Sequence, residues 1–204
     1  MSAARIAQLD EYVGLPQGHP ESYRSVVLRE VVEPLGLDPA SFMGPDGSAE
    51  DVRAACEAYD AALAAAGGVD LQLLGIGTDG HIGFNEPCSS LASRTRIKTL
   101  TEQTRADNAR FFGGDIEQVP RHVITQGIGT ILEARHLVLL ATGENKADAV
   151  ARAVEGPVAS VVPASALQLH PHATVVVDEA AASKLKLADY FRATYAAKPA
   201  WQGL

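Results

Sequence analysis

The sequence predicts an α/β fold with an open, mostly parallel sheet and helices on both faces of that sheet. Short apolar runs, such as 71–76 and 137–141, alternate with stretches of helical periodicity, which is the βαβ rhythm of a parallel sheet. Both runs end in loops rich in glycine and polar residues, as strands of open sheets do at their carboxyl ends. Without a repeat or a low-complexity linker, residues 1–204 are expected to form a single domain.

The net charge and the cysteine content of the chain exclude several classes of partner and point to a cellular compartment. A formal net charge of −8 argues against a surface for nucleic acid or for acidic membranes, so neither partner is expected. Cys56 and Cys88 lie in unlike contexts, which makes a disulfide improbable and favours a reducing compartment. The N-terminus shows no apolar signal core, and no apolar run approaches the length of a membrane span. We therefore expect a cytoplasmic protein.

The first half of the chain is expected to contain two helices. Pro20, at a tolerated first-turn position, and Pro34, as a stop, predict a helix between them. Ser48 is expected to cap a second helix, which has one apolar face and ends at the Gly-Gly pair 67–68. The segment Asp10-Glu11-Tyr12 is expected at a strand end and leads into a turn at Gly14 and Pro16.

The second half alternates expected helices and strands. Thr101 starts a helix that reaches about residue 112 and ends at a second Gly-Gly pair. The strand at 137–141 leads through a loop into a helix over 146–155, and Asp178 is expected to cap the last helix. Shorter elements are expected as strands at 123–125 and 174–177 and as helical turns at 130–134 and 164–169.

The segment from Gly75 to Pro87 is the candidate active-site loop. It reads Gly-Ile-Gly-Thr-Asp-Gly-His-Ile-Gly-Phe-Asn-Glu-Pro, and its glycines leave the backbone free to turn tightly. His81 lies between the carboxylates of Asp79 and Glu86 in this loop. A histidine with acidic neighbours, placed after a strand of an open sheet, is suited to moving protons.

The same loop satisfies a dinucleotide-binding pattern, Gly75-x-Gly77-x-x-Gly80, which we reject. Asp79 would place a carboxylate where a pyrophosphate must approach, and Asn85-Glu86-Pro87 interrupts the helix that should follow. We therefore expect no nicotinamide cofactor.

Basic side chains near the loop raise the question of an anion site. Arg94, Arg96 and Lys98 alternate along an expected strand and would project from one face. A charge-protected edge strand and a phosphate site explain this pattern equally well. Lys146, near the expected start of a helix, opposes the macrodipole, and a bound anion would relieve that conflict. A solvated lysine is the simpler explanation at that position.

Two segments resemble the signature of glucosamine-6-phosphate deaminases. They are the loop 75–87 with Ser-Arg-Thr-Arg at 93–96, and Asp-Glu-Tyr-Val-Gly-Leu at 10–15. The resemblance covers about residues 10–190. It implies a sugar-phosphate isomerase/deaminase fold and conversion of glucosamine 6-phosphate to fructose 6-phosphate and ammonia in amino-sugar catabolism. It also implies a homo-oligomer that needs neither a metal nor a cofactor.

The resemblance assigns catalytic roles to four residues. Asp10 would take the proton from C2 of the sugar, and His81 would move protons during ring opening. Asp79 and Glu86 would orient the imidazole and tune its basicity.

The resemblance also assigns two phosphate sites. Arg110 and Lys146 would hold the substrate phosphate, with Arg110 on a mobile lid around residues 100–122. A second, allosteric phosphate site of some family members matches Ser89, Arg96 and Lys98.

The chain departs from the family at its front. Members have roughly one or two βα units and a phosphate-binding loop before the Asp-Glu-Tyr segment, whereas Met1 stands nine residues before Asp10. A fragment, a misassigned start and a shortened variant stay open, and each predicts exposed apolar edges and weaker activity. A 6-phosphogluconolactonase-like hydrolase and a non-catalytic sugar-phosphate sensor are the alternative functions.

Overall fold

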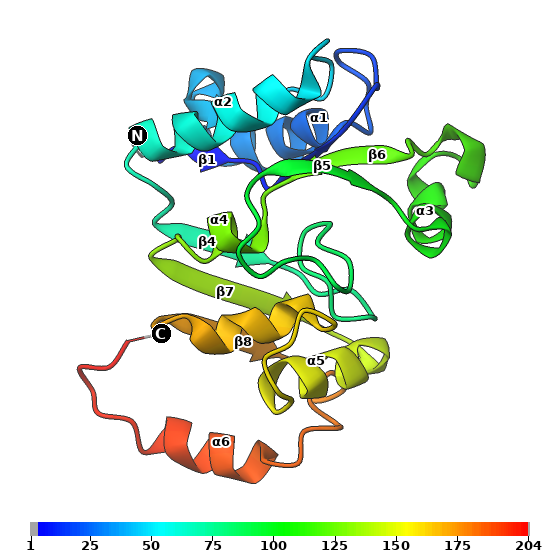
Figure 1. Cartoon of the computed structure of the whole chain (residues 1–204). Coiled ribbons are helices and arrows are strands. Elements are labelled where there is room, and N and C mark those ends of the chain that lie inside the picture. Colours follow the sequence, from blue (N-terminus) through cyan, green and yellow to red (C-terminus); the bar gives the residue numbers. More distant parts are fainter. Residues whose placement is uncertain (1–3, 204) are drawn as a thin grey trace.

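The computed structural model describes residues 4–203 and has the predicted α/β class (Figure 1). Its strands form three sets, one parallel pair, one antiparallel sheet and one parallel sheet. The parallel pair consists of β1 (Ile6–Ala7) and β3 (Phe42–Met43). The strands of the antiparallel sheet lie in the order β2 (Asp10–Tyr12), β6 (His122–Thr125) and β5 (Arg96–Thr99). Those of the parallel sheet lie in the order β4 (Leu71–Leu74), β7 (His136–Ala141) and β8 (Ala173–Val177).

The helices follow the predicted order, with shorter spans. The first α-helix continues directly into a π-helical turn, Leu28–Val32. No helix within residues 4–203 is long and apolar enough to cross a membrane. The α-helices are α1 (Tyr23–Val27), α2 (Val52–Ala65), α3 (Glu102–Asn108), α4 (Ile128–Ile131), α5 (Ala147–Val154) and α6 (Ala188–Ala196), and 3₁₀ turns occupy Pro39–Ser41, Ala109–Phe111, Ile116–Gln118, Glu144–Lys146 and Pro163–Leu169.

Two helices begin later than the sequence predicts, because the predicted caps, Ser48 and Asp178, make other contacts. The cap of α2 is Asp51, whose Oδ1 accepts from the Ala54 amide at 2.9 Å, rather than Ser48. The last helix α6 begins ten residues after Asp178, whose carboxylate accepts instead from the amides of Gly143 and Ala181.

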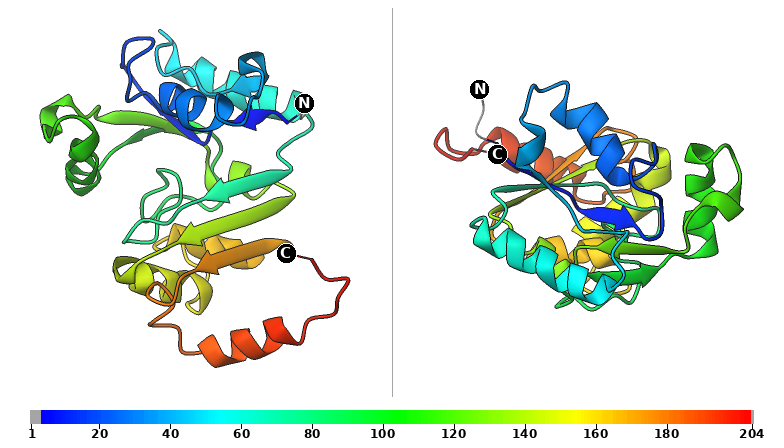
Figure 2. Two further views of the ribbon diagram at one scale, coloured as in Figure 1. Left: turned by 180° about the vertical axis from the view of Figure 1, so that it is seen from behind. Right: turned by 90° about the horizontal axis from the view of Figure 1, so that it is seen from above.

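The β4-β7-β8 sheet has two unlike faces. Leu137 and Leu139 point into the main core, where they pack with residues of α4, α5 and the turn Pro163–Leu169. The opposite face is open in the part of the chain that the structure describes (Figure 2, left). Leu71 and Leu73 are 50% and 56% exposed there. Helices therefore cover one face of this sheet, where the sequence predicts cover on both.

Strands β5 and β6 form an arm that projects from the body and carries residues 100–121 (Figure 1). Arg105 on this segment is buried, and its guanidinium donates to the carbonyls of Ile116 and Val119. The segment packs on a second hydrophobic cluster, separate from the main core, that contains Tyr12, Phe84, Leu100, Ala109, Phe112, Val119 and Val123.

Candidate active site

In the loop after β4, the ring of His81 packs directly against the backbone of Gly77. The Gly77 amide donates to the His81 carbonyl at 2.9 Å, and the Gly80 amide donates to the Gly77 carbonyl at 3.0 Å. Gly80 has a φ of +96°, which few other residues adopt. A Cβ on Gly77 would meet atoms of the His81 ring well inside contact distance. Gly77 therefore allows the close approach that fixes where the imidazole lies.

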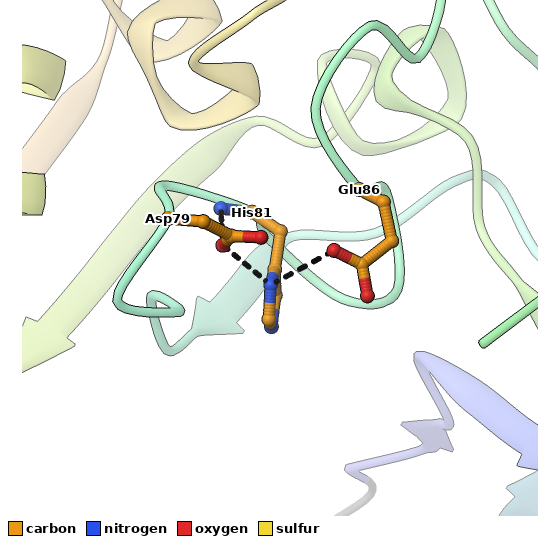
Figure 3. Close-up of side chains that lie close together, drawn as sticks. All are labelled: Asp79, His81 and Glu86. Carbon is orange, nitrogen blue, oxygen red and sulfur yellow. Dashed lines mark hydrogen bonds and ion pairs between the residues drawn. The ribbon is translucent and has the colours of Figure 1, made fainter. Parts of the chain in front are cut away.

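Two carboxylates flank the imidazole (Figure 3). His81 Nδ1 lies 2.7 Å from Asp79 Oδ1 and 3.6 Å from Glu86 Oε2. Asp79 Oδ1 also accepts from the backbone amide of His81 at 3.1 Å. Burial alone would lower the pKa of His81, but the negative charges of Glu86 and Asp79 outweigh burial and raise it. The predicted arrangement, one imidazole between two acids, is present.

Glu86 is a buried carboxylate with two differently bound oxygens. Its Oε1 accepts from the Thr104 hydroxyl at 2.6 Å, while Oε2 faces His81 and accepts no hydrogen bond within residues 4–203. Burial opposes ionisation, yet His81 and the Thr104 hydroxyl hold the pKa of Glu86 well below its ordinary value. Glu86 is therefore an anion at neutral pH.

Asp10 reaches the site from a different element. Residues 10–12 form strand β2, which agrees with the predicted strand end, and Asp10 lies opposite Thr125 in the antiparallel register. Burial raises the pKa of Asp10 to about 7, the adjacent Glu11 charge adds to that rise, and His81 opposes it. The Glu11 carboxylate itself accepts from the amides of Tyr23 and Arg24, both at 2.9 Å, at the start of α1.

Four of the predicted residues line one cavity of about 660 Å³. Asp10 comes from β2, His81 from the glycine loop, Arg110 from the arm, and Lys146 from the turn before α5. Lys146 Nζ donates to the carbonyl of Ile76, at the carboxyl end of β4, at 2.7 Å. Asp79 and Glu86 are not part of the cavity lining, and they contact the imidazole itself. The cavity therefore brings a carboxyl group, an imidazole and two cations around one space.

Arg96 and Lys98 share one side of β5, as predicted, and both are partly buried. Arg94 departs from the prediction because it precedes the strand. Its guanidinium forms ion pairs with Asp60 at 3.3 Å and with Glu133 at 2.6 Å. The three cations therefore do not form one row.

Two residues of the predicted allosteric site, Arg96 and Ser89, lie close to the glycine loop. Arg96 Nη1 donates to Asn85 Oδ1 at 2.8 Å, one residue before Glu86. Ser89 is buried, and its hydroxyl oxygen has no hydrogen-bond partner among the residues that the structure describes. An allosteric phosphate site at Ser89, Arg96 and Lys98 stays a prediction.

The sequence gives no signal for Thr104. A threonine three positions after a capping Thr101 reads as an ordinary residue of the first helical turn. Its contact with Glu86 spans 18 positions and depends on how the arm folds back onto the loop. Contacts of this kind follow from tertiary structure alone.

Comparisons with known proteins agree with this geometry. Residues 1–177 match the profile of the family described as glucosamine-6-phosphate isomerases/6-phosphogluconolactonase. The chain is 87% identical, over 100% of its length and 78% of the relative's, to a glucosamine-6-phosphate deaminase of Streptomyces avermitilis. It is 64% identical to the Mycolicibacterium smegmatis deaminase, over 98% of this chain and 77% of that relative.

Solved structures show the same fold. One of them, a protein described as a monomeric glucosamine-6-phosphate deaminase, superposes with a TM-score of 0.85 at 43% identity, over 88% of this chain and 74% of that one. A 6-phosphogluconolactonase from Trypanosoma brucei superposes with a TM-score of 0.69 at 18% identity, over 89% of this chain and 74% of that one, and shares the fold. The chain therefore belongs to the glucosamine-6-phosphate isomerase/6-phosphogluconolactonase family.

Proposed function

We propose that this chain converts glucosamine 6-phosphate and water into fructose 6-phosphate and ammonia. The observation that carries the proposal is the shared cavity, in which Asp10 and His81 lie with the cations Arg110 and Lys146. Relatives at 61–87% identity are named glucosamine-6-phosphate deaminases, which supports the same substrate. The substrate class is thus a small sugar phosphate.

The first steps need groups that bind phosphate and move protons. Lys146 and Arg110 bind the phosphate dianion, which holds the sugar in one orientation. His81 moves a proton between the anomeric hydroxyl and the ring oxygen, so that the C1–O5 bond opens to give the aldehyde form. Asp79 and Glu86 stabilise the imidazolium that forms when His81 holds this proton.

The isomerisation then depends on Asp10. Its carboxylate takes the proton from C2, and a proton delivered to C1 completes the aldose-to-ketose shift with an imine at C2. Water adds to this imine and ammonia leaves, which gives the ketone. A pKa of about 7 suits a group that must first accept and then return a proton near neutral pH.

The lactonase and sensor alternatives have less support. The solved lactonases are 16–20% identical to this chain, a similarity that reaches the fold alone. A sensor would need the cation sites but no base, whereas Asp10 lines the same cavity as the cations. A homo-oligomer and a cytoplasmic location stay predictions, and the solved deaminase described as monomeric gives oligomerisation no support.

The test is steady-state ammonia release from glucosamine 6-phosphate, with hydrolysis of 6-phosphogluconolactone assayed beside it. We expect ammonia from the intact chain and at least about a hundredfold less from His81→Gln. Lactone hydrolysis without ammonia release would assign the alternative enzyme. Ligand-dependent thermal stabilisation without turnover would assign the sensor.

A further inference from the structure

Thr104 joins the arm to the glycine loop through its hydroxyl. Thr104 Oγ1 lies 2.6 Å from Glu86 Oε1 and 2.9 Å from the hydroxyl of Thr101, the cap of α3. The carboxylate of Glu86 is ionised and accepts only, so the Thr104 proton points at Glu86. Thr101 therefore donates to Thr104. The two hydroxyls form a directed chain from the start of α3 to Glu86.

The contact is buried on both sides. Thr104 is 9% exposed and Glu86 is 6% exposed, so little bulk water competes with the hydroxyl for this carboxylate. Glu86 Oε1 accepts this hydrogen bond, while Oε2 faces Nδ1 of His81 at 3.6 Å. The hydrogen bond to Oε1 therefore fixes the orientation of the whole carboxylate, including Oε2 beside His81.

The same arm carries the phosphate-binding candidate Arg110, in the 3₁₀ turn that follows α3. Thr104 and Arg110 both line the 660 Å³ cavity. A movement of this segment that brings Arg110 onto a bound phosphate therefore also changes the position of Thr104 relative to Glu86.

We propose that Thr104 is a positioning residue that holds Glu86 Oε2 against His81 and so links the position of the arm to the proton chemistry of the imidazole. This inference rests on the proposed function. Thr104 touches no reacting atom in it, because its hydroxyl acts through Glu86. When α3 leaves its place, Glu86 loses the one hydrogen bond that its carboxylate accepts within residues 4–203, and His81 loses an oriented anion.

The kinetic test compares variants that differ in one hydroxyl. Thr104→Val removes the hydroxyl at nearly constant volume, and Thr104→Ser keeps it. The matched control is Thr130→Val, another buried threonine, whose 3.4 Å contact is with Asp60, away from the cavity. We expect Thr104→Val to lower kcat about 10- to 100-fold with KM changed less than about threefold. Thr104→Ser and Thr130→Val should stay within about threefold of the parent in kcat.

A second readout does not depend on turnover. The His81 imidazole is titrated by NMR in the parent and in each variant, and its signals are assigned by their loss in His81→Gln. We expect the pKa of His81 to fall by about half a unit or more in Thr104→Val alone, because the unanchored carboxylate turns away. An unchanged or raised pKa, or a serine variant as impaired as the valine variant, would overturn the inference. A parent that titrates as expected but releases no ammonia would instead refute the proposed function.

Discussion

Asp10 and Glu86 are acids of one site whose surroundings move their pKa values in opposite directions. Asp10, on β2 beside Glu11, has its pKa raised to about 7. Glu86, in the glycine loop between His81 and Thr104, has a lowered pKa although it is also buried. The difference teaches that burial alone does not set the charge of a carboxyl group. The hydrogen-bond donors and charges that the fold places beside the carboxyl group decide its pKa.

The two acids also have opposite links to stability. The folded chain binds the Asp10 proton more tightly than the unfolded chain does, since 3.8 is the ordinary pKa. The free energy of unfolding that this group contributes therefore falls as pH rises from about 4 to about 7. For Glu86 the sign reverses, because its lowered pKa stabilises the fold above its ordinary value of 4.5 and that stability is lost in acid.

The largest effect expected from this comparison is at Asp10. Asp10→Asn should reduce ammonia release about 1000-fold or more, because an amide cannot take the C2 proton. The same variant should be more stable than the parent at pH 8, by about 1–2 kcal/mol, since a partly buried charge is removed. Activity assays and thermal melts at pH 5 and pH 8 measure both. A variant that is inactive but less stable at pH 8 would break the comparison.

Glu86→Gln should have a smaller effect on turnover and the opposite effect on stability. We expect a 10- to 100-fold fall in kcat, roughly, because the imidazolium loses one of its two anions. The melting temperature should fall at pH 7, and the difference from the parent should shrink as pH falls from about 4.5 towards about 2, where the parent's stabilisation from this carboxylate is lost. Equal destabilisation at both pH values would show that Glu86 acts through packing alone.

The smallest effect concerns Glu11, which adds a like charge beside Asp10. Glu11→Gln removes that charge, so the acidic limb of kcat/KM should move to lower pH by about half a unit. Glu30→Gln is the control, because Glu30 is an exposed acid on the following π-helical turn. If the acidic limb of the kcat/KM profile does not move in Glu11→Gln, burial alone raises the pKa of Asp10. Melts of both variants check that the start of α1 stays folded.

The glycine loop was predictable in detail because its chemistry is local in sequence. Asp79, His81 and Glu86 lie within eight positions, so the loop alone brings them together. Asp10, Arg110 and Lys146 were placed at the site by resemblance, and their common cavity depends on sheet order that spacing does not encode. The pairing of residues 10–12 was not predicted, because the partner strand, β6, lies more than a hundred positions away.

Errors at helix ends have a related cause. Ser48 and Asp51 are both good caps, and only the observed bond from Ala54 to Asp51 distinguishes them. The uncovered side of the β4-β7-β8 sheet could not be read from its strands, because an apolar run such as 71–74 looks the same whether one face or both are covered.

The second hydrophobic cluster, which holds the arm, shares no buried residue with the main core. We therefore expect local opening of residues 100–121 to leave β4, β7 and β8 packed, at a lower free-energy cost than global unfolding. Backbone amides of α3 should exchange with deuterium while those of β7 stay protected. A lid role for this segment stays a prediction; it implies that a sugar phosphate enters and leaves by local opening of a small subdomain.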